Sequence, residues 1–291
     1  MRNTMISNHL DLIPEQLWLS FNNDNTVATL NFHHEKSRNA VSAEVAGALS
    51  ELSEAFLGNN IQHPVMDFLK EKKLLVLSLR SHCEGVFLSG GNLHELASMP
   101  HSKGELFTKQ MRRFTQMLRS APFVTVAILN GIAAGGGAEI ALAADLRLSI
   151  SKAVQIHFAQ TYWGVPAGWG MMSDLSLKNI FGGERRRGIA MAAQESLDLE
   201  ALCIHQLIDA RFENTDSPEV ASQMWLDAFV ERLLRCPEQL RNALIVERPH
   251  VLADKLADFD KNLFDQYWLG PVHRGRIHEY REMRSKQKKD S

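Results

Sequence analysis

Two glycine-containing turns are the parts of this sequence best suited to chemistry. The first covers Phe87–Leu93 and the second Asn130–Glu139, and each joins an apolar, strand-like run to a helix-like segment. Glycine lets a ligand approach the main chain closely, and the first N–H groups of a helix are unpaired and carry a partial positive charge. If the turns face each other, two N–H groups can converge on one oxygen as an oxyanion hole that stabilises an enolate. A glycine triplet alone is as often a device for tight packing of a helix on a sheet.

The elements around these turns follow an alternating order. Strands are predicted at Thr26–Phe32, Leu74–Leu79, Val124–Leu129, Leu146–Ile150 and Val154–Phe158. Helices are predicted at Val41–Leu57 with Ser42 as N-cap, at Glu105–Arg119 and at Ala138–Ala144, whereas Asn59–Glu71 is predicted as a loop or a short turn. From Gly168 to Phe264 the pattern is almost entirely helical. This order predicts an α/β core over residues 1–210 and a helical region over residues 211–291.

Composition limits the classes of function. Of 291 residues, 45% are apolar, and 32 Lys and Arg nearly balance 34 Asp and Glu to give a formal net charge of −2. This balance does not favour nucleic acid or an anionic membrane as the main partner. Cys83, Cys203 and Cys236 have no CxxC spacing, and the twelve histidines show no metal-ligand spacing. We therefore predict free thiols in a reducing compartment and no metal site.

The two ends of the sequence are polar. Residues Met1–Leu10 contain no apolar run typical of a signal peptide, and no stretch approaches the roughly 20 apolar residues that span a bilayer. The expectation is a soluble, cytoplasmic protein. The charged tail from Arg274 onward could bind nucleic acid or lipid, but a solvated C-terminus is the simpler interpretation.

These motifs, taken in order along the chain, resemble the crotonase (enoyl-CoA hydratase/isomerase) superfamily. The resemblance runs from Thr26 to about Asp209 and includes Ser37–Ala40, the Phe87–Asn92 turn, the Gly135–Glu139 segment followed by Ala144–Asp145, and then Phe158 and Trp169–Gly170. It implies a spiral of ββα units whose C-terminal helices mediate trimers, often paired into hexamers. It also implies that the ligand is an acyl-coenzyme A thioester and that no separate cofactor is needed, because coenzyme A is part of the substrate.

The resemblance assigns roles to individual residues. The N–H groups of Gly91 and Gly136 would form the oxyanion hole, the backbone around Ser89 and Gly91 would contact the adenine end of coenzyme A, and the segment near Arg38 would line its path. Glu139 falls where hydratases carry the first of two catalytic glutamates.

The second glutamate is missing, because Tyr162, followed by Trp163, stands at that position. Hydration of a double bond uses two carboxylates to hold and deprotonate one water, and a phenol, which ordinarily ionises only near pH ~10, is a poor base at neutral pH. Ordinary hydratase activity is therefore not expected. Tyr162 has an alternative role as a space-filling aromatic in the pocket or at a subunit contact, and Glu139 has one as a helix-start carboxylate.

Other departures point to a subgroup. Asn92 replaces the aspartate that commonly follows the first turn; it could contact substrate, but capping the next helix is favoured. The Trp163–Gly170 stretch resembles the methylmalonyl- and ethylmalonyl-CoA decarboxylases, and Phe264–Pro271 resembles the tail of the ethylmalonyl type. An aromatic wall of Tyr162 and Trp163 would desolvate a substrate carboxylate and favour its loss as CO2, and Glu139 or an ordered water would then reprotonate the α-carbon. Decarboxylation of a short malonyl-type thioester is thus our leading hypothesis. Hydration or isomerisation on a modified site, and a catalytically silent acyl-CoA-binding protein, remain alternatives.

Overall fold

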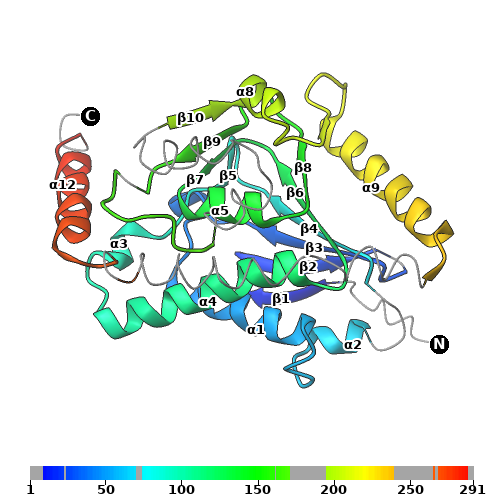
Figure 1. The fold of residues 1–291 in the computed structure, drawn as a ribbon, viewed down its shortest axis with the longest axis horizontal. Coiled ribbons are helices and arrows are strands. Elements are labelled where there is room, and N and C mark those ends of the chain that lie inside the picture. The colour runs from blue at the N-terminus through cyan, green and yellow to red at the C-terminus, as the bar shows by residue number, and fades with distance from the viewer. Residues whose placement is uncertain are drawn as a thin grey trace.

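Two β-sheets form the centre of the protein (Figure 1). The computed structural model describes residues 9–22, 24–69, 74–160, 162–170, 195–238, 265 and 268–287. The larger sheet has the order β1-β2-β3-β4-β6-β8-β11, with bounds His9–Ile13, Leu17–Phe21, Val27–Phe32, Val76–Ser81, Val124–Leu129, Leu146–Ser149 and Ala210–Arg211. The smaller sheet has the order β10-β9-β7-β5, with bounds Glu195–Asp198, Gln155–Phe158, Ile132–Ala134 and Val86–Leu88.

The chain alternates between these sheets. Strands β4, β6 and β8 lie parallel in the large sheet, and β5, β7 and β9, which follow them in sequence, lie parallel in the small one. Helix α3 (Leu93–Leu96) follows β5, and helix α5 (Gly136–Ala143) follows β7. The units β4-β5-α3 and β6-β7-α5 are therefore two ββα units, which agrees with the predicted α/β spiral. Since β5 and β7 are parallel neighbours, the glycines that follow each strand, Gly90–Gly91 and Gly135–Gly137, emerge at the same edge of the sheet.

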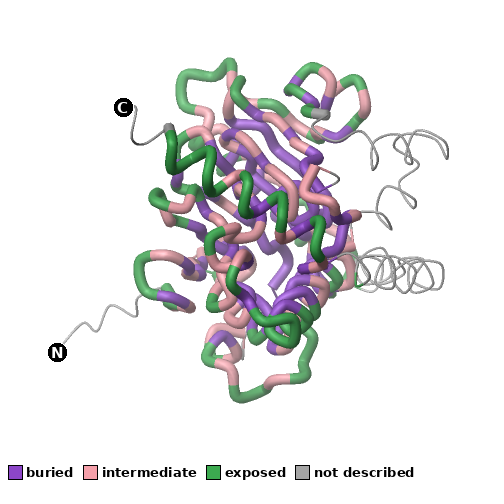
Figure 2. The backbone as a smooth tube through the Cα atoms, turned by 90° about the vertical axis from the view of Figure 1, so that its left-hand side faces the viewer, coloured by how far each residue is buried: buried purple, intermediate pink, exposed green. Residues whose placement is uncertain are grey.

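Helices cover the sheets, and the buried backbone gathers in the centre of the molecule (Figure 2). Strand β4 is buried over its length apart from half-buried Arg80, as expected for a strand covered on both faces. Helices α1 (Ala43–Phe56) and α4 (His101–Ser120) pack against each other, with Leu49, Leu52 and Phe114 in the core. The remaining described helices are η1 (Glu35–Ser37), α2 (Val65–Leu69), α8 (Leu199–Ile204), α9 (Pro218–Arg235) and α12 (Pro271–Gln287).

Most predicted elements are confirmed within one or two residues, and the Ser42 hydroxyl accepts the N–H of Val45 as predicted for an N-cap. The helical prediction after Gly168 is wrong at β10 and β11, which are strands of four and two residues. Such strands are too short to show a period of two. Strands β1 and β2 were missed, although the alternating burial of Leu17–Phe21 matches the pattern of a half-buried strand. Strands β5 and β7 were missed too, because they lie largely within the two segments predicted as turns. The parts of that helical prediction over residues 171–194 and 239–264 lie outside the described residues.

The predicted division at residue 210 stays a prediction. Strand β11 continues the large sheet through β8, so the sheet reaches the proposed boundary. Within the described residues, no helix combines the length and the apolar character that crossing a membrane requires.

Candidate active site

The two glycine turns lie in direct contact. A methyl group placed on Gly90 would lie 2.9 Å from the carbonyl oxygen of Ala134 and 3.2 Å from the amide nitrogen of Gly136. Gly90 also has a φ of +91°, which side chains resist. Pairing of β5 with β7, with Val86 opposite Ile132, brings the turns together. Only glycine fits this contact.

The N–H groups of Gly91 and Gly136 are those predicted to form the oxyanion hole, a role that stays a prediction. Val41 bonds to the residues on either side of Gly91, donating its N–H to Gly90 and accepting the N–H of Asn92. In a parallel bridge of this kind, the N–H of the central residue points away from the paired segment. Gly136 is the first residue of α5, so its N–H has no partner inside the helix. Both glycines line one cavity of about 570 Å³.

Glu139 lies buried in the wall of this cavity, with an exposed fraction of 2%. One carboxylate oxygen accepts the N–H of Trp169 at 2.6 Å. The other accepts the N–H of Gly168 at 3.2 Å and the side-chain N–H of Gln160 at 3.3 Å. Hydrogen bonds to an ionised carboxylate are stronger than neutral ones. The side chain therefore ties α5 to the segment around residue 168, a role that the sequence did not reveal.

That tie places Trp169 against Gly136. A methyl group on Gly136 would lie 2.2 Å from the Trp169 ring, and one on Gly91 would lie 2.9 Å from Leu96 and 3.9 Å from Phe107. The rings of Trp169 and Phe107 meet edge to face with centroids 5.8 Å apart. Apolar side chains thus exclude water beneath the two glycines, and neither position has room for a Cβ atom.

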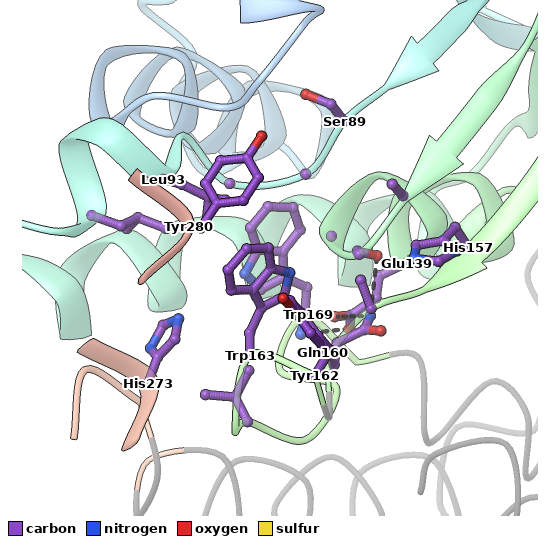
Figure 3. A pocket seen from close by; sticks show the side chains of 18 of the residues that line it. Ser89, Leu93, Glu139, His157, Gln160, Tyr162, Trp163, Trp169, His273 and Tyr280 are labelled. Atoms are coloured by element: carbon purple, nitrogen blue, oxygen red, sulfur yellow. Dashed lines mark hydrogen bonds between the residues drawn. The ribbon is translucent and has the colours of Figure 1, made fainter. Parts of the chain in front are cut away.

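Aromatic side chains from two distant segments form another wall (Figure 3). Tyr162 and Trp163 make an edge-to-face pair at 5.0 Å, and Trp163 makes a second with Tyr280 of α12 at 5.4 Å. The guanidinium of Arg276 lies 5.9 Å from the centre of the Tyr162 ring. Helix α12 therefore covers the cavity. Among the described residues, Glu139 is the single carboxylate of the cavity wall, and neither Lys nor Arg lines it.

The start of α12 is fastened to the first half of the chain. The Arg274 guanidinium donates to the carbonyl oxygens of Ala97 and Met99, and the Trp268 indole N–H donates to Gly104 at 3.0 Å. These hydrogen bonds join residues about 160–180 positions apart in sequence. They hold α12 over the cavity.

Two histidines of the cavity wall were not predicted as site residues from the sequence. His273 is 2% exposed, and burial together with the positive charge of Arg274 lowers its pKa to about 4. His157 is half-buried in the cavity wall, and burial lowers its pKa. No motif marks His273, because its role depends on where α12 folds back.

The other predicted site residues divide into two groups. Ser89 lines the cavity, and its hydroxyl donates to the carbonyl of Ser37 at 3.2 Å. Arg38 is exposed at the end of η1 and lies outside the residues that line the cavity. Asn92 is also outside it, and its side-chain oxygen accepts the N–H groups of His94 and Glu95, which confirms the capping interpretation. The binding roles of Arg38 and Asn92 stay predictions.

The sequence and the structure were compared with known proteins. A family model described as enoyl-CoA hydratase/isomerase matches residues 22–204. The chain is 32% identical over 143 residues to the mitochondrial enoyl-CoA hydratase domain-containing protein 2 of Bos taurus. The aligned region covers 45% of this chain and 48% of that protein. It is 26% identical over 194 residues to the ethylmalonyl-CoA decarboxylase of Mus musculus, covering 65% of this chain and 58% of that protein.

Structural similarity extends further along the chain. The crystal structure of an enoyl-CoA hydratase from Bacillus halodurans matches 90% of this chain and 99% of that one, with a TM-score of 0.73 and 17% identity. The chain spans about half to two thirds of the length of the curated relatives that it matches. The family model covers more than half of the chain, and the ββα spiral agrees with it. The chain therefore belongs to the enoyl-CoA hydratase/isomerase family.

Proposed function

We propose that this chain binds an acyl-CoA thioester and decarboxylates a short malonyl-type acyl group. The proposal rests on one observation about the cavity wall. Two glycines, with their amides, line the cavity, and the single carboxylate of its described wall already accepts three N–H groups. Such a cavity can stabilise an enolate, while its described wall offers one carboxylate and not the two that hydration uses.

The reaction needs few groups from the protein. The bond between the α-carbon and the carboxylate breaks, CO2 leaves, and the electron pair moves into the thioester carbonyl to form an enolate. The N–H groups of Gly91 and Gly136 stabilise the new oxyanion. The α-carbon then takes one proton from the hydroxyl of Tyr162 or from water, and solvent returns that proton. A phenol is protonated at neutral pH, so it suits the role of donor better than that of base.

The cavity also favours loss of the carboxylate. Trp163, Trp169 and Tyr162 present apolar surface, and the described wall offers no Lys or Arg to pair with a bound carboxylate. A poorly solvated and unpaired carboxylate is destabilised relative to neutral CO2. The sequence similarity between this chain and the mouse ethylmalonyl-CoA decarboxylase supports the same reaction.

Hydration is less compatible with this arrangement. It requires two carboxylates on one water, yet Tyr162 occupies the second position and both oxygens of Glu139 accept backbone or amide N–H groups. Assembly into trimers or pairs of trimers, and a cytoplasmic location, are further proposals that follow from the family resemblance and from composition.

Parallel assays with ethylmalonyl-CoA and crotonyl-CoA test the proposal. We expect release of CO2 with formation of butyryl-CoA from the first thioester and no appreciable hydration of the second. Hydration of crotonyl-CoA at an ordinary enzymatic rate, without CO2 from ethylmalonyl-CoA, would refute decarboxylation. Tight binding of both thioesters with no turnover would instead identify a catalytically silent binding protein.

A further inference from the structure

His273 reaches the cavity from α12, where no sequence motif indicates a ligand-binding residue. Its ring lies 4.8 Å from that of Trp268, and Figure 3 shows it at the opposite side of Trp163 from Ser89. The side chain is nearly fully buried, yet it belongs to the cavity wall. A polar group in such a place must find its hydrogen bonds either in the protein or in a ligand.

The described residues provide a hydrogen bond to only one of its two ring nitrogens. The N–H of Leu269 donates to Nδ1 at 3.0 Å, so Nδ1 carries the lone pair and Nε2 carries the proton. Burial and the adjacent Arg274 keep the pKa of His273 near 4, and the ring is therefore neutral at physiological pH. No hydrogen bond joins Nε2 to any of the described residues. The group left for a ligand is thus a single neutral N–H donor.

A chain of aromatic contacts places this donor away from the reacting carbonyl. Phe107 lies beneath Gly91, Trp268 stacks on Phe107 with centroids 6.2 Å apart, and His273 follows Trp268. Two rings therefore separate His273 from the oxyanion position. Ser89, assigned to the coenzyme A side, lies at the other side of the cavity (Figure 3). His273 accordingly faces the far part of the acyl group.

We infer that His273 determines acyl specificity, with its Nε2–H donating a hydrogen bond to a neutral oxygen, a ketone or a hydroxyl, carried by the acyl group beyond the reacting carbons. A second carboxylate would lack an ion-pair partner in the cavity, because no described Lys or Arg lines the wall and the guanidinium of Arg274 is bonded to the carbonyl oxygens of Leu269, Ala97 and Met99. The inference rests on the proposed thioester binding, but not on which reaction follows.

Two substitutions distinguish ligand binding by His273 from a structural role in which its side chain only fastens the start of α12. His273→Asn keeps an acceptor near Nδ1 for the Leu269 N–H but loses the reach of Nε2. His273→Gln carries an N–H donor to the position of Nε2 but gives up the acceptor at Nδ1. If the side chain only fastens the start of α12, the Asn variant should behave as the parent protein does.

Calorimetric titration of the full chain with hexanoyl-CoA, 4-oxohexanoyl-CoA and 5-oxohexanoyl-CoA provides the test. We expect one oxo ester to bind about tenfold more tightly than hexanoyl-CoA, as one net hydrogen bond predicts. In His273→Asn that preference should vanish while the affinity for hexanoyl-CoA changes less than about twofold, and His273→Gln should retain part of the preference.

Two results would overturn the inference while leaving the proposed function intact. These are binding of hexanoyl-CoA without preference for either oxo ester, and a preference that survives in His273→Asn. A protein that binds none of the three thioesters would refute the proposed function itself, and the inference with it.

Discussion

Replacing Glu139 with glutamine tests whether its carboxylate supports the site. The carboxylate accepts three N–H groups with its two oxygens. An amide offers one oxygen, so at least one buried N–H, from Gly168 or Trp169, would face the new NH2 group. Losing a charge-assisted bond and leaving a buried donor unpaired costs about 3 kcal/mol. For a chain of this size, we expect the melting temperature to fall by roughly 5 °C.

Glu95→Gln is the matched control. One of its carboxylate oxygens accepts the N–H of Ala43 at 3.1 Å, and Glu95 is only half-buried. Glutamine can keep that single bond through its own oxygen, so the loss should stay below about 1 kcal/mol. Urea unfolding of both variants at pH 7.5, followed by circular dichroism, gives the two free energies. Equal stabilities for Glu139→Gln and the parent protein would show that the carboxylate does not anchor the Trp169 segment.

Three further predictions concern the cavity and its cover. Gly136→Ala places a methyl group 2.2 Å from the Trp169 ring, so thioester affinity, measured by calorimetry, should fall more than tenfold. Gly275→Ala is the control, because open space surrounds its new methyl group, and its affinity should not change. Normal binding by Gly136→Ala would contradict the close contact. Tyr162→Phe should lower the kcat for decarboxylation about 100-fold if the hydroxyl supplies the proton, and an unchanged kcat with normal KM would assign that step to water. The His273 pKa of about 4 lies below the value of 6.5 for a free side chain. As the pH drops from about 6.5 towards 4, the unfolded chain therefore takes up a proton that the folded chain does not, and the free energy of unfolding falls. The loss between pH 7.5 and 5 should be about 2 kcal/mol. Chemical unfolding at both pH values should show this loss diminished in His273→Asn, and an identical pH dependence would contradict it.

Local patterns determined much of the fold from the sequence. Strand β6, the N-cap at Ser42 and the capping side chain of Asn92 were all predicted, because each depends on residues within one or two turns of the chain. The short strands β10 and β11 were not, since their pairing with β9 and β8 rather than their own residues makes them strands. The glycine-rich turns were visible as motifs, and parallel pairing of β5 with β7 explains why they meet.

Tertiary structure decided which side chains surround the glycines. The sequence marks Glu139, but the three donors that bond to its carboxylate come from residues 160–169, so its anchoring contacts could not be predicted, and its catalytic role stays a prediction. Trp163 meets Tyr280, and His273 enters the wall, only because Arg274 and Trp268 bind backbone carbonyls more than 150 residues away in sequence. Long-range contacts of this kind have no period or spacing in the sequence. Their partners are chosen by packing and by the need of buried polar groups for hydrogen bonds.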